Sequence, residues 1–357
     1  ASDVYKRQAF ELIAALQARD ISFISFRNAL KANELPVSTG WAATVKKLEP
    51  YVKDPAKKDE FLDTIQTIHD ELTLYTDKAV VIYDLGKSLT ADLLIALSTD
   101  FIDSESPYLE SFPVPLSRDE LLEAPLEVTC VDQWDFVGGS NFIFCSRQNL
   151  TERAELPAEL MDEEARENYG SFDELIGIRR TPVQLFDSVS ISKVHNTLEI
   201  RVDGIKKFNS DDVQKRLHRI RLVIQNKYKD VFSSKLQWPA PVNFYDALDR
   251  LYADKDGIVG ELGHLTDASG MYHERMRHKT MDVRSDPYHN GGADAVKGLN
   301  IHQISKHWLS PSGYGHPEVS IPSNFIIASE SEPAVNIIHV LNCASEDDYN
   351  FVLNKVL

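Results

Sequence analysis

Paired strand-length segments separated by short turns constrain the fold of this chain more than any other feature. Three such pairs are expected, at residues 128–136 and 141–145, 184–192 and 197–202, and 258–265 and 271–276. Turn residues such as Gly138–Gly139 and His195–Asn196 lie between the partners. Strands joined by so few residues pair antiparallel, because a parallel pair needs a long crossover connection.

Helical patterns occupy most of the remaining chain. Apolar residues at helical spacing predict that the first 78 residues are mainly helical, and residues 79–83 have the length of one strand. Ser210 followed by two aspartates predicts the start of a helix at residues 210–232. Further expected elements are helices at 90–97, 157–169 and 243–253 and after Ser345, and strands at 324–328 and 335–341. The predicted class is α+β: a helical N-terminal region with a small sheet, then a mainly antiparallel-sheet domain with flanking helices.

Charge divides the same chain abruptly. The formal net charge is −17, yet residues 101–176 carry −14 and residues 177–229 carry +7. The change of sign predicts two domains, a helix-rich one at 1–176 that includes the acidic segment, and an α+β one at 177–357. Apolar residues make up 43% of the chain, and this fraction excludes an intrinsically disordered protein.

Basic side chains cluster within the second predicted domain. Alternation along residues 271–276 also directs His273, Arg275 and Arg277 to one strand face. Local positive charge attracts phosphates and acidic surfaces, so a nucleic acid, a nucleotide or an acidic protein partner is expected. The predicted anion-binding residues are Lys206, Lys207, Lys215, Arg216, Arg219, Arg221, Arg275 and Arg277.

Histidines concentrate in the same domain, with seven of the eleven between residues 264 and 316. Imidazole and carboxylate together suit a divalent metal, and an open metal site activates water. The predicted ligands are His273, His278, Asp282 and His289. Their spacing matches no known ligand signature, since His273 and His278 are five residues apart rather than four.

Two further patterns suggest a nuclease. Asp187 followed by Glu199-Ile200-Arg201 is similar to a restriction-type nuclease core, although Arg stands where that core has Lys. Residues 286–294 with Asn300 and His307 resemble a histidine–asparagine–histidine endonuclease, which would imply a metal and a general base here. The glycine pair follows His289 too closely for that family, and its cysteine pairs are absent.

Three functional interpretations therefore remain open. They are a binding protein that uses the local basic patch, a metal-dependent hydrolase or nuclease that uses residues 264–316, and a complex subunit whose acidic surface mimics a polyanion. Oligomerisation is left open. No membrane span is expected, and three scattered cysteines and the lack of a secretory signal within residues 1–20 predict a cytoplasmic protein. Residues 2–8 resemble a translated sequencing-adapter remnant, which implies a microbial source and leaves the origin of residues 1–8 open.

Overall fold

A computed structural model describes residues 2–157, 160–170, 174–267 and 270–357. The helices are α1 (Ser2–Ala18), α2 (Phe23–Ala32), α3 (Trp41–Lys53), α4 (Lys58–Tyr75), α5 (Gly86–Leu97), α6 (Pro107–Ser111), α7 (Arg118–Glu123), α8 (Glu163–Tyr169), α9 (Ser210–Phe232), α10 (Ala247–Ala253), α11 (Pro287–Asp294), α12 (Phe325–Ala328) and α13 (Glu346–Val356). The strands are β1 (Lys78–Asp84), β2 (Thr129–Phe136), β3 (Gly139–Leu156), β4 (Leu175–Ser192), β5 (Thr197–Val202), β6 (Ile258–Thr266), β7 (Met271–Arg275), β8 (Leu299–His307), β9 (Glu318–Ile321) and β10 (Ile338–Leu341). The predicted α+β class is confirmed.

One antiparallel sheet runs through the whole molecule in the order β2-β3-β4-β5-β1-β10-β9-β8-β6-β7. β1 comes from the helical N-terminal region but lies at the centre, between β5 and β10. Residue 176, the predicted domain boundary, falls inside β4. The division into two domains at that residue stays a prediction.

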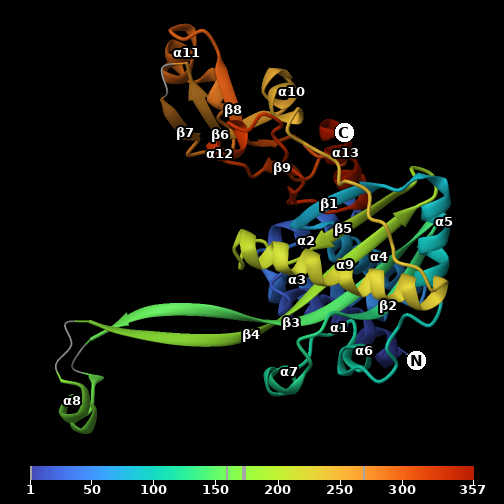
Figure 1. The fold of residues 1–357 in the computed structure, drawn as a ribbon. Coiled ribbons are helices and arrows are strands. Elements are labelled where there is room, and N and C mark those ends of the chain that lie inside the picture. The colour runs from blue at the N-terminus through green and yellow to red at the C-terminus, as the bar shows by residue number, and fades with distance from the viewer. Residues whose placement is uncertain (1, 158–159, 171–173, 268–269) are drawn as a thin grey trace.

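Helices cover both faces of the β2-to-β1 half of the sheet (Figure 1). β1 is buried on both faces, so its side chains alternate between two cores. Val81 packs with Leu93 of α5 and Ile220 of α9, whereas Val80 and Ile82 pack on the opposite face. A separate apolar cluster holds together the four helices α1, α2, α3 and α4. This half forms the body of the molecule.

The other half of the sheet, from β9 to β7, forms a second lobe with α10, α11 and α12 (Figure 1). The predicted hairpin around residues 267–270 is present as β6 and β7, with Leu262 opposite Glu274. Its turn includes residues 268–269, which lie outside the described residues. β8 and β9 were not expected from the sequence.

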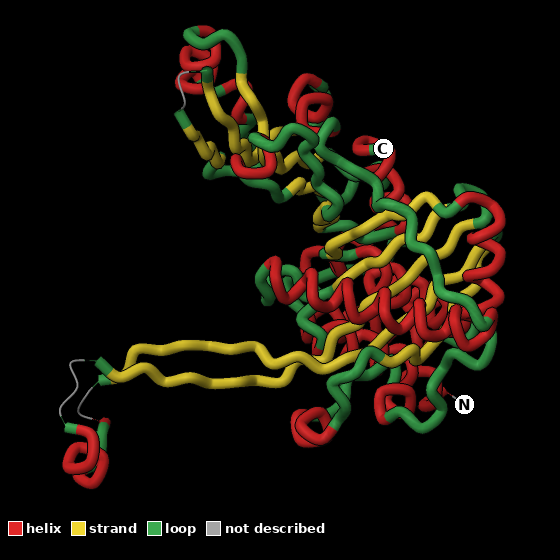
Figure 2. Tube along the Cα trace, viewed as in Figure 1, coloured by secondary structure: helices red, strands yellow, loops and turns green. Residues whose placement is uncertain are grey.

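β3 and β4 extend far beyond the body as a two-stranded hairpin (Figure 2). Each strand has 18 residues, and pairing continues from Gly139–Ser192 to Leu156–Leu175. Beyond the pair Leu150–Thr181 most side chains are exposed. The predicted strand at 184–192 is therefore only the inner part of β4. Of the predicted helix at 157–169, residues 158–159 lie outside the described residues, and α8 covers residues 163–169.

One predicted element is wrong. Residues 324–328 are mainly helical rather than a strand, because the Asn324 side chain accepts hydrogen bonds from the backbone N–H groups of Ile326 and Ile327. Within the described part of the chain, no helix has both the length and the apolar character that crossing a bilayer requires.

Candidate metal centre

The β6–β7 hairpin positions two side chains of the site by strand alternation. His264 lies directly opposite Tyr272, and the two rings stack with centroids 5.3 Å apart. Glu274 is two residues further along β7 and therefore points to the same face. His273 and Arg275 point to the other face, where Glu261 lies.

The third side chain comes from α11, which begins beside the hairpin. Asp286 caps this helix by accepting hydrogen bonds from the backbone N–H groups of Tyr288 and His289, and Pro287 occupies its first turn. This fixed start directs His289 inward, where it is 3% exposed.

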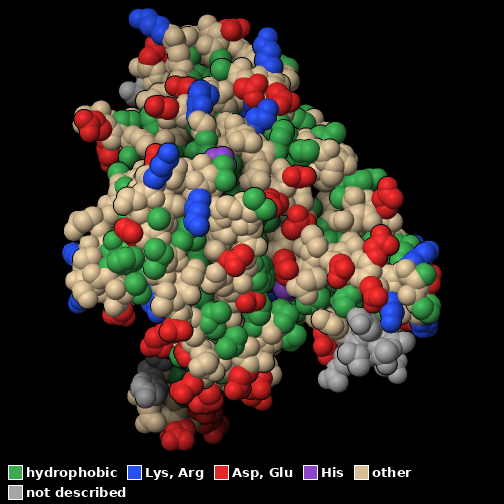
Figure 3. Space-filling view, turned by 90° about the vertical axis from the view of Figure 1, so that its right-hand side faces the viewer, with side chains coloured by type: hydrophobic (Ala, Val, Ile, Leu, Met, Phe, Trp, Pro, Cys, Tyr) green, Lys and Arg blue, Asp and Glu red, His purple; other side chains and the backbone are tan. Residues whose placement is uncertain are grey.

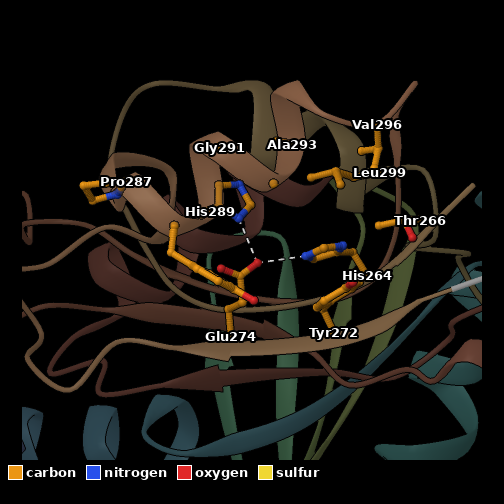
Figure 4. A pocket seen from close by; sticks show the side chains of 12 residues that line it. His264, Thr266, Tyr272, Glu274, Pro287, His289, Gly291, Ala293, Val296 and Leu299 are labelled. Atoms are coloured by element: carbon orange, nitrogen blue, oxygen red, sulfur yellow. Dashed lines mark hydrogen bonds and ion pairs between the residues drawn. The ribbon is translucent and has the colours of Figure 1, made fainter. Parts of the chain in front are cut away.

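The three side chains converge on one carboxylate oxygen (Figure 4). His264 Nε2 and His289 Nδ1 each lie 2.8 Å from Glu274 Oε1, so each ring donates an N–H to that oxygen. All three candidate ligand atoms lie within 4.8 Å of one another. Around a tetrahedral ion with ligands at about 2.0–2.1 Å, ligand atoms are about 3.3 Å apart, so small shifts would admit an ion.

The surroundings also suit a metal ion. His289 donates from Nδ1 to Glu274, so its Nε2 is an acceptor. The hydroxyl group of Tyr252, near the end of α10, donates a hydrogen bond of 2.8 Å to this Nε2. Ligating histidines commonly hold such a partner on the second ring nitrogen, which fixes the ring orientation. His264 differs from His289 in this respect, because its Nδ1 is buried without a hydrogen-bond partner among the described residues.

A cavity of about 400 Å³ opens above the three side chains. Its wall includes Tyr272, Thr266 and Leu299, and the two glycines Gly291 and Gly292 of α11. A Cβ atom at either glycine would meet nothing within 4 Å, so the glycines leave that side open. No Lys or Arg side chain lines this cavity among the residues that the structure describes.

Of the predicted ligands, the structure places only His289 in this cluster. His273 Nε2 lies 2.7 Å from Glu261 on the opposite face of the hairpin, and His278 is exposed. Asp282 caps a short 3₁₀ turn and pairs with Arg284 at 2.7 Å. The four predicted ligands are thus not brought together, and their joint role stays a prediction.

The predicted anion-binding residues divide into four groups. Arg216 is 1% exposed and pairs with Asp187 at 3.2 Å, so it belongs to the interior. Arg219 is exposed without a partner among the described residues, and Arg221 lies over the rings of Tyr83 and Trp238. Lys207 and Lys215 pair with nearby aspartates. Lys206, Arg275 and Arg277 line one groove of about 600 Å³.

The nuclease patterns are not assembled into sites. Register places Asp187 and Glu199 on opposite faces of the sheet, since Ser188 pairs with Arg201 and Ser190 with Glu199. Asp187 binds Arg216, and Glu199 binds Arg201 and Tyr349. His289 and His307, the pair suggested by the endonuclease resemblance, line different cavities.

His264 and Glu274 were missed although the sequence held a signal for both. Because side chains alternate along β7, Tyr272 and Glu274 point to one face of the strand and His273 and Arg275 to the other. The predicted hairpin turn places His264 opposite Tyr272. The prediction used the face of the strand that carries His273 and Arg275 rather than the face that carries Tyr272 and Glu274. α11 could not be placed from the sequence, because its contact with the hairpin is not local.

Comparison with known proteins gives no further guide. No protein-family model matches the chain, and no curated protein is significantly similar to it.

Proposed function

We propose that this protein is a metal-dependent hydrolase whose centre is His264, Glu274 and His289. The observation that carries the proposal is the convergence of two imidazole nitrogens on Glu274 Oε1 at the base of a cavity. Two histidines and one glutamate are the protein ligands of many catalytic zinc sites. Such a set leaves a coordination position open for water and substrate.

The donor set favours Zn²⁺ or a neighbouring first-row transition ion over Mg²⁺ or Ca²⁺. Imidazole nitrogen suits transition ions, whereas Mg²⁺ and Ca²⁺ prefer oxygen donors. His264, Glu274 and His289 would hold the ion, and a Zn²⁺ bound there would supply a water of lowered pKa and would polarise the carbonyl group of an ester or amide substrate.

The lining of the cavity favours an uncharged substrate. Pro287, Val296 and Leu299 give it apolar walls, and the described residues supply no Lys or Arg that could hold a phosphate. A carboxylic ester or amide with an apolar acyl group therefore fits better than a phosphodiester. The lining of the cavity therefore supports a hydrolase of esters or amides rather than a nuclease.

Metal binding provides the first test. We expect metal-free protein to bind one Zn²⁺ per chain in calorimetry, and the His264→Ala and Glu274→Gln variants to lose this binding. Tyr252→Phe, which removes only the hydroxyl on His289, should weaken binding by about 10-fold to 100-fold. Hydrolysis of apolar p-nitrophenyl esters and anilides should then require the added metal.

His273→Ala supplies the matched control. His273 is the neighbour of Glu274 on β7, but it faces Glu261 on the other side of the hairpin. We expect this variant to bind Zn²⁺ as the unaltered protein does. Equal loss of binding in His273→Ala and His264→Ala would contradict the proposed centre and favour the ligand set predicted from the sequence.

A further inference from the structure

A basic groove lies where the second lobe meets the body. The basic groove is a cavity of about 600 Å³ that is lined by four cationic side chains, those of Lys206, Arg275, Arg277 and Lys279. Lys206 comes from the loop between β5 and α9, Arg275 is the last residue of β7, and Arg277 and Lys279 lie in the segment that follows β7. Segments about 70 residues apart in sequence thus contribute positive charge to one concave surface.

Two of these cations are unused. Arg277 and Lys279 are exposed, and neither side chain has an ionic or hydrogen-bond partner among the described residues. The two acids in the groove are engaged, since Glu261 accepts from Gln303 and His273, and Glu318 accepts from Asn342. The groove therefore offers free donors for an acidic occupant.

The chain carries an exposed acidic element at the end of its long hairpin. The hairpin arm, residues 151–156 and 175–180, ends in α8, whose acidic tip holds Asp162, Glu163, Glu164 and Glu167. All four carboxylates are exposed. The arm projects away from the body, and α8 lies apart from β7 and from the start of α9, next to which the groove-lining cations lie (Figures 1 and 2).

The arm also has the features of a segment that is stabilised by a partner. A two-stranded hairpin without a third strand or a covering helix is marginally stable in water. Ile176 and Ile178 are 59% and 56% exposed on one face of the arm, and Leu156 is 40% exposed on the other. Apolar side chains on a free arm lose contact with water when another chain packs against them.

We propose that the acidic tip of one copy docks in the basic groove of a second copy. The exchange is reciprocal, so two identical contacts form and the assembly is a closed dimer with two-fold symmetry. The charge complementarity and the uncovered arm are independent observations that point to the same occupant. The proposal does not depend on the metal centre, because the groove lies on the opposite face of the β6–β7 hairpin.

Ionic strength should control this dimer in a specific way. Two copies that each carry −17 repel one another at long range. At about 0.1 M salt the Debye length is about 10 Å, so that repulsion is screened while close contacts between carboxylates and guanidinium groups persist. At about 1 M salt the close contacts weaken as well.

Light scattering coupled to size-exclusion chromatography tests the proposal through charge reversal. We expect a dimer in 0.1 M NaCl and a monomer in 1 M NaCl. The groove variant Arg277→Glu with Lys279→Glu, and the tip variant Glu163→Lys with Glu164→Lys, should each be monomeric in 0.1 M NaCl. An equal mixture of the two variants should form a heterodimer, because each reversed surface then meets its complement.

The control reverses two exposed lysines elsewhere, Lys87→Glu with Lys235→Glu, which changes the net charge as much as the groove variant does. This control should remain dimeric. A monomeric unaltered protein at 100 µM in 0.1 M NaCl would overturn the proposal, as would dimeric single-surface variants or a mixture that stays monomeric. Binding of a fluorescent oligonucleotide by that monomer, lost in the groove variant, would instead assign the groove to a polyanion.

Discussion

At the residue scale, several of the residues that the sequence singled out by charge serve the interior. Arg216 belongs to the basic helix, yet it is buried against Asp187 and also donates to the backbone carbonyl of Asp203. Burial raises the pKa of Asp187 although Arg216 lowers it. Composition and spacing show that a helix is basic, but which of its side chains face the sheet depends on the register of packing.

Arg216 and Arg219 form a matched pair for a stability test. They are three residues apart on α9, but only Arg216 is buried. We expect Arg216→Ala to lower the free energy of unfolding by about 3–5 kcal/mol, because it leaves the Asp187 carboxylate buried and unpaired. Arg219→Ala should change it by less than about 0.5 kcal/mol. Urea denaturation would measure both, and equal effects would contradict the buried pair.

Glu71 on α4 gives stability a distinct pH dependence. Burial raises the pKa of this carboxyl group from 4.5 to about 7, and a hydrogen bond from the backbone N–H of Glu346 lowers it in part. The folded state holds the proton of Glu71 more tightly than the unfolded state does. Glu71 therefore contributes fully to the free energy of unfolding below pH 4.5, and this contribution is lost as pH rises through about 7.

Glu71→Gln should therefore stabilise the protein at pH 8 by about 1–3 kcal/mol and leave it little changed at pH 4.5. The amide oxygen can still accept the hydrogen bond from Glu346. Urea denaturation at the two pH values measures the difference. The same change at the exposed residue Glu60 of α4 is the control, and a gain of equal size there would assign the effect to net charge alone.

At the element scale, local signals predicted well and distant contacts did not. The three expected hairpins are present because a tight turn and strand alternation act over few residues. β8 and β9 escaped prediction, since Ile304 and Ile321 find their partners only in the folded sheet. The long arm was missed because its two strands, residues 151–156 and 175–180, are separated by 18 residues rather than by a tight turn, and only the folded hairpin shows that they pair.

The arm should be dispensable for the fold of one copy. Replacing residues 151–180 by Asn-Gly would join Leu150 to Thr181, which already face one another, through a turn that suits a hairpin. We expect the free energy of unfolding of the shortened monomer to change by less than about 1 kcal/mol. A larger loss, measured in 1 M NaCl where the unaltered protein is also monomeric, would show that the arm supports the body.

At the scale of the whole molecule, acidity is spread widely while the cations of the groove are local. Carboxylates are scattered over the face shown in Figure 3 and form a dense group at its lower edge. The sequence predicted acidity concentrated in residues 101–176 and positive charge in residues 177–229, whereas Arg275, Arg277 and Lys279 of the groove lie outside that basic block. The structure adds that one apolar core contains Val80 of β1, Ile143 of β3 and Val259 of β6, from both halves of the chain.

This shared core predicts that the monomer unfolds in one step. Trp41 lies in the helical N-terminal region and Trp308 follows β8 in the second lobe, so variants that retain one of these tryptophans report on the two halves. In 1 M NaCl we expect both to give the same urea midpoint, which should also match the loss of helix by circular dichroism. Two separate midpoints would support two autonomous domains.

The central place of β1 has a consequence for how the chain reaches this structure. Val80 pairs with Ile338, about 260 residues later, so the middle of the sheet closes only when almost the whole sequence is available. Until then one edge of a strand with five consecutive apolar residues, Ala79 to Tyr83, stays open to other chains, which is a hazard for aggregation. Refolding should accordingly be slow and its yield should fall as protein concentration rises, whereas the local hairpins can form early.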